Sequence, residues 1–540
     1  MRRPHAASIG LGLLLVLAAG SWLWYGLTQR SIVEDDGISI LAAQGILRHG
    51  IPQLPSGALY HRGYVPHYLL AGSMALFGTN DLGIMMPSLF LGLVTVFLVF
   101  RTGRDVLKRP FVGLIAAALL AALQLETFYA TSPRMYMALQ CFSLLASYCA
   151  WRGFVAGERA FRWPAAFAAG AAILSHQQGG VLLVALPAAV LAARRMQRTT
   201  RPRLPWRAAL TGLAVLCGLF YLASIYKPPT ALRPIVAPGR QVVRHRELNL
   251  DVQQWRRHGR ELERIVPFGL LLSPVVLWAA LSTVRRNHRS RQHLMFFMTL
   301  AAVNALAVVA ATRSTYQRFW FYALPPYLLL LVMSAAVVRD EWNAPASRPP
   351  RPWDARGRLA AAGVGGLAAL VWLAATGSLR VDRYVERVRS AFGSPCVEGE
   401  CMASTEHAYR RLRDQLAADD LIIATNPWTA SYYLGRVDGV LLQSRLTDGS
   451  FAPFETPTDR YFGAPLVDTA GELESLRAGA RRVWVVTDRK LERYNSQDTR
   501  DRLTRSWTLS LWLDRVRVYC NRGERIAASL TQENTLQFVR

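Results

Sequence analysis

The chain has 540 residues, of which 52% are hydrophobic, and its formal net charge is +27. Its apolar residues form uncharged blocks of about 17–20 residues, the length that crosses a bilayer core about 30 Å thick. This pattern excludes a soluble globular protein, in which apolar residues would be dispersed in amphipathic patterns. Basic chains can bind nucleic acid through its phosphates. Here, however, most Arg residues lie in short loops between apolar blocks, where the positive-inside bias explains them, so no nucleic-acid partner is predicted.

The apolar blocks predict about eleven membrane-spanning helices. The first runs from Ile9 to Leu27 and is expected to stay uncleaved, because it is long and lacks a clear small-residue cleavage site. The segment His67–Gly78 is too short to span and is predicted to be an interfacial helix. The other predicted spans are 84–100, 111–125, 135–151, 164–175, 178–193, 208–226, 267–284, 294–312, 319–338 and 359–379.

The distribution of Lys and Arg predicts a protein of the cell inner (plasma) membrane with a cytoplasmic N-terminus. In that orientation the cytoplasmic segments carry 24 Lys and Arg residues and the outside loops carry 15. Nine of these fifteen lie in one outside loop, 227–265. Its segment 247–265 is typical of an amphipathic helix lying on anionic lipid. A helix that gates a cavity is the competing interpretation, and we slightly favour the surface helix.

We therefore predict an α-helical polytopic membrane protein with a C-terminal extracytoplasmic α/β domain. Residues 1–379 form the predicted membrane domain, including a periplasmic loop at 28–83, and residues 380–540 form the soluble domain. In the soluble domain, strands are predicted at 421–425, 482–488 and 516–520, and helices at 407–418 and 471–478. It has no phosphate-loop glycine pattern. Cys396 and Cys401 flank a polar loop and would be able to pair in an oxidising compartment.

The interiors of the predicted spans contain no Asp, Glu, Lys, Arg or His. Proton and ion transporters place such groups at mid-membrane depth. The site is therefore predicted at the outer membrane surface, where loops gather polar residues. This favours an enzyme that acts on a lipid headgroup over a carrier.

The first outside loop begins with an acidic run, Glu34-Asp35-Asp36, directly after the first predicted helix. Three adjacent carboxylates repel one another, so one of them is expected to be neutral or to have a cationic partner. A carboxylate at a dry membrane boundary suits a general base that deprotonates a hydroxyl. An acidic cap at the start of the next helix explains the same residues equally well.

The same loop ends in a basic and aromatic segment, Tyr60–Tyr68. Arg62 suits bidentate binding of a phosphate, and His61 and His67 accompany it. Tyr and Arg also serve as ordinary anchors at membrane surfaces. We favour phosphate binding for Arg62, which shares its loop with three carboxylates, and anchoring for His67.

Further polar residues are predicted at the outer ends of other helices. They are Arg134, Tyr136, His176, Arg313, Tyr316 and Arg318. The close pair Arg313 and Arg318 at a membrane boundary suits a lipid phosphate, although solvation of their loop explains the two residues too. A lone His at a helix turn is more often a hydrogen-bonded structural residue than a ligand. Arg134 alone would serve as an anchor, and Tyr136 as a core residue.

Two stretches of sequence carry a family resemblance. The first is EDDGISILAAQGILRHGIPQLP at 34–55 followed by HYLLAGSMALFG at 67–78, and the second is SPRMY at 132–136. The first resembles the first periplasmic loop of the C-type glycosyltransferases (GT-C), and the second is similar to their Ala-Arg-Met-Tyr segment. The closest groups are relatives of protein O-mannosyltransferases and of the lipid A aminoarabinose transferase. The resemblance covers about residues 1–340.

The resemblance implies roles for individual residues. Counting from Gly50 aligns Asp35 with the family's catalytic Asp and Asp36 with its Glu, and leaves Glu34 as a further acidic candidate. Counting back from the Leu-Phe-Gly at 76–78 aligns Arg62 with the family's phosphate-binding Lys. The family's Pro-Pro is reduced here to a single Pro, so this last alignment is approximate.

One departure from the family bears on metals. Some relatives place an acidic residue two positions before the Arg of the second stretch, as a metal ligand or second carboxylate. This sequence has Ser132 there, with Glu126 as the nearest acid. The motif for a divalent metal is therefore incomplete, and no cofactor is predicted.

The resemblance implies transfer of a sugar from a polyprenyl-phosphate donor to a glycolipid, glycan or protein acceptor outside the membrane. It also implies an inverting single displacement, with Asp35 as general base and the Arg residues around the departing phosphate. Two rival functions are a lipid or polysaccharide transporter and a non-catalytic scaffold for envelope assembly. A transporter would need mid-membrane polar groups, and a scaffold would have no need of the acidic run.

Overall fold

The computed structural model covers the membrane helices and the C-terminal sheet in separate stretches. It describes residues 3–32, 34–196, 252–266, 288–311, 316–342, 396–397, 400–401, 403–445 and 451–526, apart from 453, 455, 456, 460, 480, 489, 514 and 515. The predicted spans 208–226, 267–284 and 359–379 lie outside these residues, as do the side chains of Cys396 and Cys401.

The chain divides into two compact units. The first, here called the membrane unit, comprises Met1–Leu27, Arg62–Ile225 and Arg246–Glu400. The second, here called the sheet unit, comprises Thr28–His61, Tyr226–His245 and Cys401–Arg540. The segment that carries the acidic run is thus part of the sheet unit. The domain boundary near residue 380 stays a prediction, since it falls outside the described residues.

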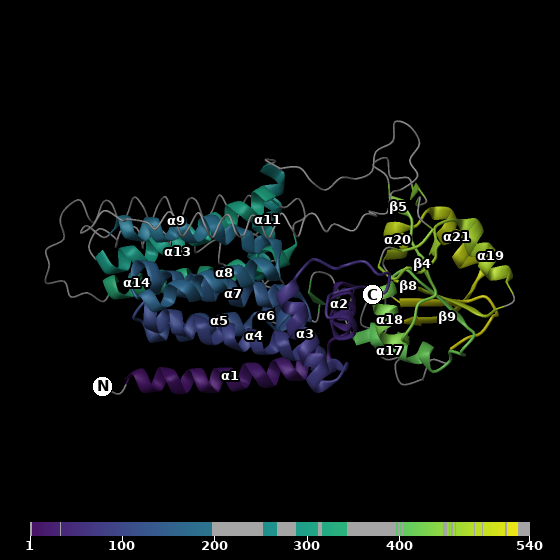
Figure 1. Ribbon diagram of the computed structural model, residues 1–540, viewed down its shortest axis with the longest axis horizontal. Helices are drawn as coiled ribbons and strands as arrows, with labels where there is room; N and C mark the ends of the chain where they lie inside the picture. The colour runs from purple at the N-terminus through teal and green to yellow at the C-terminus, as the bar shows by residue number, and fades with distance from the viewer. Residues whose placement is uncertain are drawn as a thin grey trace. The chain divides into compact units, whose positions relative to one another are not determined.

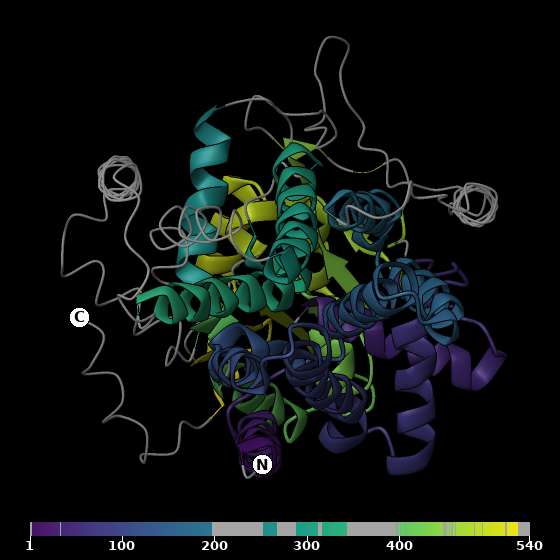
Figure 2. The same ribbon diagram turned by 90° about the vertical axis from the view of Figure 1, so that its left-hand side faces the viewer.

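Most helices of the membrane unit are apolar and run side by side (Figure 1), and Figure 2 shows α1 end on beside the N label. Its helices are α1 (Arg3–Thr28), α3 (Tyr64–Phe77), α4 (Asp81–Arg101), α5 (Pro110–Ala122), α6 (Gln124–Ala130), α7 (Met135–Ala150), α8 (Arg162–Ser175), α9 (Leu182–Arg195), α11 (Val252–Ile265), α13 (His288–Ala311) and α14 (Leu324–Trp342). Short helical turns η1 (Thr102–Val106), η2 (Trp151–Val155), η3 (Arg159–Phe161), η4 (Gln177–Val181), η5 (Gln317–Phe319) and η6 (Phe321–Ala323) join them.

Several of these helices are long and apolar enough to cross a membrane. Among the described residues, four qualify: Ala6–Thr28, Asp81–Val106, Gln177–Arg195 and Arg291–Val309. The pair α5 and α6 would add a fifth, although it is bent by 73°. The chain is therefore a multi-pass membrane protein. The total of about eleven spans and the orientation of the termini stay predictions.

The bend between α5 and α6 differs from the prediction. A span was expected at 111–125 with an outside loop at 126–134, but the helix ends at Ala122 and a second one runs over Gln124–Ala130. Leu123 between them is extended, which breaks the helical path. The helix pair α4 and α5 is closely packed, because a Cβ on Gly103 would lie 2.2 Å from the Gly113 Cα. Such small-residue contacts let membrane helices approach closely.

The sheet unit is built on a six-stranded sheet with the order β7-β4-β3-β8-β10-β9. Strands β3 (Leu421–Ala424), β4 (Gly439–Leu441), β7 (Leu466–Val467) and β8 (Val483–Thr487) are parallel, whereas β9 (Thr508–Leu513) and β10 (Val516–Cys520) complete one edge in antiparallel pairing. The short strands β1 (Cys396–Val397), β2 (Glu400–Cys401), β5 (Ser444–Arg445) and β6 (Phe451–Ala452) form two separate ribbons. The three predicted strands are confirmed as β3, β8 and β10.

Helices cover both faces of the sheet (Figure 1). One core contains Ala424, Trp484 and Val486 of the sheet with residues of α17 (Ala403–Arg413) and α18 (Pro427–Leu434). The opposite core contains Ile423 and Val485 with residues of α19 (Ala470–Ala478) and α21 (Gln497–Ser506). Alternate residues of one strand thus face opposite layers, which is why these strands read as continuous apolar runs. A fifth helix, α20 (Lys490–Tyr494), follows β8.

The helix predicted at 407–418 was misplaced. It runs over Ala403–Arg413 and ends earlier than expected, because the chain turns there toward β3. The Asp420 carboxylate accepts a hydrogen bond from the Ala417 N–H at 2.9 Å and forms an ion pair with Arg482 at 2.7 Å. These contacts hold the pKa of Asp420 below its usual range against the effect of burial. The helix predicted at 471–478 is confirmed as α19, with Thr469 capping it.

Helix α2 (Glu34–His49) lies against α18 in the sheet unit (Figure 1). A Cβ on Gly37 would lie 2.6 Å from the Trp428 Cβ, so glycine permits the close approach of the two helices. The Ile32 N–H donates a hydrogen bond of 2.9 Å to the Tyr433 hydroxyl. The start of α2 is therefore fixed by the first turns of α18.

Candidate active site

The acidic run forms the first turn of α2. The helix begins at Glu34, whose side chain lies outside the described residues. Asp35 is half-buried, and its backbone carbonyl accepts a hydrogen bond from the Ser39 hydroxyl. Asp36 is fully buried and forms an ion pair with Arg30. The run thus occupies a helix N-terminus, where carboxylates are favoured, and its members differ sharply in their surroundings.

Arg30 is a residue that the sequence analysis missed. It lies just before α2 and is itself only 9% exposed, so both members of the ion pair with Asp36 are taken from water. A buried carboxylate needs such a partner. The sequence signal was the cation six positions before Asp36, which predicts contact only if the chain turns back on itself. This pairing makes Asp36 a residue that holds the start of α2.

A basic cluster lies in the membrane unit, formed by residues from three separate segments. Burial, together with the positive charges of Arg62 and Arg318, lowers the pKa of His176 to about 4. His176 lies between α8 and η4, Arg62 directly before α3, and Arg318 in η5. These three predicted residues are brought together by the fold. The segment before α3 and the end of α8 are closely packed, because a Cβ on Gly63 would lie 3.2 Å from the Ser175 carbonyl oxygen.

The His176 ring is held in a defined orientation. Its Nδ1 accepts a hydrogen bond of 3.1 Å from the Gln178 N–H, so the neutral ring carries its hydrogen on Nε2. The ring packs against Tyr136 with centroids 5.4 Å apart. Tyr136 in turn packs against Tyr129, which packs against Phe321. His176 can therefore donate a hydrogen bond from Nε2 without carrying charge.

Arg318 and Tyr316 form a second contact within the cluster. The Arg318 guanidinium lies 4.2 Å from the centroid of the Tyr316 ring, a cation–π contact. Both side chains are half-buried, whereas Arg62 is exposed. Arg313, the other predicted member, lies outside the described residues. The described part of the cluster therefore combines two cations and a neutral His.

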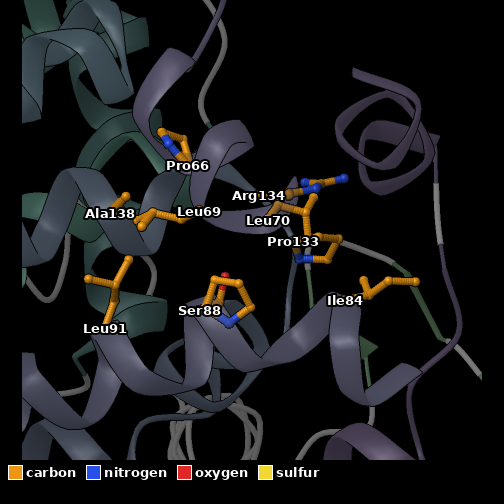
Figure 3. Close-up of a pocket in the computed structure, with 10 residues that line it drawn as sticks. Pro66, Leu69, Leu70, Ile84, Ser88, Leu91, Pro133, Arg134 and Ala138 are labelled. Atoms are coloured by element: carbon orange, nitrogen blue, oxygen red, sulfur yellow. The ribbon is translucent and has the colours of Figure 1, made fainter. Parts of the chain in front are cut away.

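Arg134 lies directly before α7 and lines a small pocket (Figure 3). It is only 3% exposed. The rest of the lining is mainly apolar and comes from α3, α4 and the start of α7: Pro66, Leu69, Leu70, Ile84, Pro87, Ser88, Leu91, Pro133 and Ala138. The Ser88 hydroxyl donates to the Ser132 carbonyl oxygen and fixes the turn before Arg134. A single buried cation among apolar side chains suits an anion attached to an apolar chain.

The remaining predicted histidines differ in burial. His67 is fully buried in α3, and burial lowers its pKa to about 4, against the opposing effect of the Gly63 and Arg62 carbonyls. His61 is half-buried and ends the Thr28–His61 segment of the sheet unit. His67 is thus packed inside the unit, and the choice between anchoring and phosphate binding for it stays a prediction.

A buried polar network also escaped the sequence analysis. The Gln140 side-chain amide donates to the Glu126 carboxyl at 3.1 Å and to the Phe321 carbonyl oxygen at 3.0 Å. Glu126 and Gln140 are both fully buried. This network joins α6 and α7 to η6, which follows the segment that carries Arg318.

In the part of the chain that the structure describes, no group of three or more His, Cys, Asp or Glu residues is placed to hold a metal.

Comparisons with known proteins bear on the membrane unit and on the whole fold. Residues 61–221 match the family model described as dolichyl-phosphate-mannose-protein mannosyltransferase. The crystal structure of ArnT from Cupriavidus metallidurans in the apo state matches with a TM-score of 0.56 and 14% identity, over 96% of this chain and 99% of that one. The chain has the GT-C fold.

A second ArnT structure from the same organism, bound to undecaprenyl phosphate, matches this GT-C chain with a TM-score of 0.54 and 15% identity. The match covers 95% of this chain and 98% of the ArnT chain. Among curated proteins, no significant match was found. The segment matched by the family model contains six of the predicted residues, which are His61, Arg62, His67, Arg134, Tyr136 and His176.

Proposed function

We propose that this GT-C protein is a membrane glycosyltransferase that moves a hexosyl or pentosyl residue from a polyprenyl-phosphate donor to an acceptor outside the membrane. The acceptor is a glycolipid, a polysaccharide or a protein. One ArnT structure of the same fold is bound to undecaprenyl phosphate, and the matching family is named for a dolichyl-phosphate donor. In the proposed orientation the N-terminus is cytoplasmic and the sheet unit lies outside.

The observation that carries the proposal is the basic cluster around His176. Two Arg side chains from different segments act on one neutral His, whose Nε2–H is available as a donor. Such an arrangement suits a phosphate, because guanidinium groups bind its oxygens bidentately and a neutral imidazole adds a directional hydrogen bond. Preorganised cations stabilise the negative charge that develops on a departing phosphate.

The proposed reaction is a single displacement. Asp35 takes the proton from the acceptor hydroxyl, whose oxygen attacks the anomeric carbon of the donor. The bond between that carbon and the phosphate oxygen breaks, and its electrons pass to the polyprenyl phosphate, which leaves. Arg62, Arg134 and Arg318 neutralise this leaving group, with Arg313 as a further candidate. Attack opposite the leaving group inverts the anomeric centre.

The structure also supports a division of labour within the acidic run. Asp36 is neutralised by Arg30 and fully buried, so its proposed role is to hold the start of α2. Asp35 is half-buried, which leaves its carboxylate able to meet a substrate. Arg134, with the apolar lining of its pocket, is proposed to meet the lipid part of the donor next to the phosphate.

The test is mass spectrometry of envelope glycolipids and glycoproteins from a strain that lacks the gene. We expect one sugar residue to be missing, and to return with the wild-type gene but not with Asp35→Asn at equal expression. The product that loses its sugar names the acceptor class. An unchanged set of glycans in the deletion strain would refute the enzyme. Restoration by Asp35→Asn would instead favour a scaffold or transporter.

A further inference from the structure

The sheet unit has a topological switch point. Strand β3 has β4 on one side and β8 on the other. The chain passes from β3 to β4 through α18 on one face, and from β7 to β8 through α19 on the opposite face. In open α/β sheets, ligands bind outside the carboxyl ends of the strands at the point where the strand order reverses. Here that point is between β3 and β8.

Polar side chains follow both strands at this edge. Thr425 and Asn426 come directly after β3, and Asp488 comes directly after β8. The Thr425 hydroxyl lies 2.9 Å from one Asp488 carboxylate oxygen, and the Asn426 amide donates to the other at 3.1 Å. Thr425 and Asn426 are buried and Asp488 is half-buried. The carboxyl edge therefore carries donors and acceptors where the two strands diverge.

Asn495 supplies an independent sign of a ligand. It is fully buried, and neither its amide nitrogen nor its amide oxygen has a hydrogen-bond partner among the described residues. It lies at the same edge, because Gln443, just beyond β4, donates from its N–H to the Tyr494 carbonyl and accepts from the Ser496 N–H. An unsatisfied buried amide destabilises a fold, because it loses its hydrogen bonds to water without replacing them. A binding partner for this amide would explain its presence.

The proposed base lies on a helix that docks at this edge. Helix α18 begins at Pro427, directly after Asn426, and its next residue, Trp428, lies against Gly37 of α2. Trp428 also packs edge-on against Tyr461, with centroids 4.4 Å apart. Asp35 is thus two residues from the contact that joins α2 to the start of α18. The edge and the base are held together within one unit.

We propose that the carboxyl edge at β3 and β8 binds the acceptor, and that the acceptor is a hydroxyl-rich glycan. This rests on the proposed transferase. Amide and hydroxyl groups donate and accept hydrogen bonds and a carboxylate accepts them, which together match the donors and acceptors of sugar hydroxyls. The segment after β3 reads Thr425-Asn426-Pro427 and lacks the glycines of a phosphate-binding loop, which argues against a nucleotide.

The test measures glycan binding by saturation-transfer NMR on the full-length protein in detergent. The probe is the water-soluble oligosaccharide released by mild acid from the envelope of the producing cells. Asn495→Leu replaces the unsatisfied amide with an apolar side chain of similar size. We expect at least tenfold weaker binding at an unchanged or raised Tm. Gln497→Leu, two residues away and exposed, is the matched control and should bind like wild type.

A second variant guards against a folding defect. Asn426→Ser keeps a side chain that caps α18 but removes the amide that reaches Asp488, and it should also weaken binding. Asp35→Asn should lower the rate of sugar transfer by about 10²–10⁴-fold while the carboxyl edge still binds the oligosaccharide, so failure of the transferase and failure of this inference are distinguishable. Wild-type binding by well-folded Asn495→Leu and Asn426→Ser would overturn the proposal. Binding of a Ser/Thr-rich peptide in place of the oligosaccharide would overturn the glycan.

Discussion

The two units differ in how their buried titratable groups are kept from carrying an unpaired charge. In the membrane unit, burial and two neighbouring cations keep His176 neutral, so positive charge is concentrated on Arg62 and Arg318. In the sheet unit, the buried Asp36 is neutralised by Arg30. In the proposed mechanism the first region offers its charge to a phosphate, whereas the second uses an ion pair to fix a helix. This contrast is why we propose Asp35 for proton transfer and a structural role for Asp36.

The largest expected effect separates the two aspartates. Asp35→Asn should lower the rate of sugar transfer by about 10²–10⁴-fold, the usual contribution of a general base, with little change in Tm. Glu34→Gln is the control and should retain most of the activity. The measurement is transfer from a radiolabelled polyprenyl-phosphate sugar at saturating substrate. Equal losses in both variants would mean that the run acts as a block of charge rather than through one base.

Removing Arg30 should unfold the sheet unit rather than slow the reaction. Arg30→Ala leaves Asp36 buried without its partner, which destabilises by about 3–5 kcal/mol. Arg502→Ala is the control, because its pair with Asp498 is exposed and contributes less than about 1 kcal/mol. Thermal unfolding in detergent measures both. Restored stability in an Arg30→Met, Asp36→Leu double variant would support a structural pair, and a stable Arg30→Ala would contradict it.

Removing a cation from the basic cluster should weaken the donor complex. Arg318→Met keeps the apolar stem but loses a charged hydrogen-bond donor, a loss of about 1.5–3 kcal/mol. We expect the KM for the polyprenyl-phosphate sugar to rise about 10–100-fold. Arg104→Met, at an exposed position before α5, should leave KM unchanged. An unaltered KM in Arg318→Met would remove η5 from the donor site.

In the buried network of α6, α7 and η6, replacing the Glu126 carboxyl with a carboxamide should lower the stability less than removing the side chain. Glu126→Gln keeps an acceptor for the Gln140 amide, whereas Glu126→Ala leaves that amide partly unsatisfied, at about 1–3 kcal/mol. The second variant should show the lower Tm, with transfer reduced through misplacement of η6. Equal Tm values in the two variants would show that the hydrogen bond contributes nothing.

A further prediction concerns pH. Burial lowers the pKa of His67 and of His176 to about 4, below the ordinary value near 6.5. The unfolded chain therefore binds protons first as pH falls, so stability is fully present above about pH 6.5 and is lost progressively toward pH 4. Tm measured between pH 8 and 4 should follow this course. His67→Leu should show a shallower loss, and an identical loss would exclude His67 as a cause.

The sequence predicted the elements that local patterns determine. Apolar blocks predicted the helices α1 and α3, and apolar runs predicted β3, β8 and β10, because periodicity and burial act over a few residues. The interfacial position of α3 stays a prediction. The gathering of Arg62, His176 and Arg318 was predicted only as a set of residues on one side. Their proximity depends on three segments far apart in sequence, and counting spans cannot supply it.

Other features needed the fold itself. The Arg30–Asp36 pair depends on a turn just before α2, and the Glu126–Gln140 contact depends on the break at Leu123. Both involve polar residues that look like loop or cap residues in the sequence. The docking of α2 on α18 joins distant residues, since Ile32 and Tyr433, which share a hydrogen bond, are 401 positions apart. Such long-range contacts leave no periodic signal.

The central claim is sugar transfer from a polyprenyl phosphate. The most direct measurement incubates the purified protein with radiolabelled undecaprenyl-phosphate sugars and delipidated envelope acceptors, and then follows label in acceptor and lipid together with the anomeric configuration of the product. We predict that one donor sugar is transferred per polyprenyl phosphate released, with inversion at the anomeric carbon. Label that stays entirely on the lipid across the panel of sugars and acceptors would contradict it.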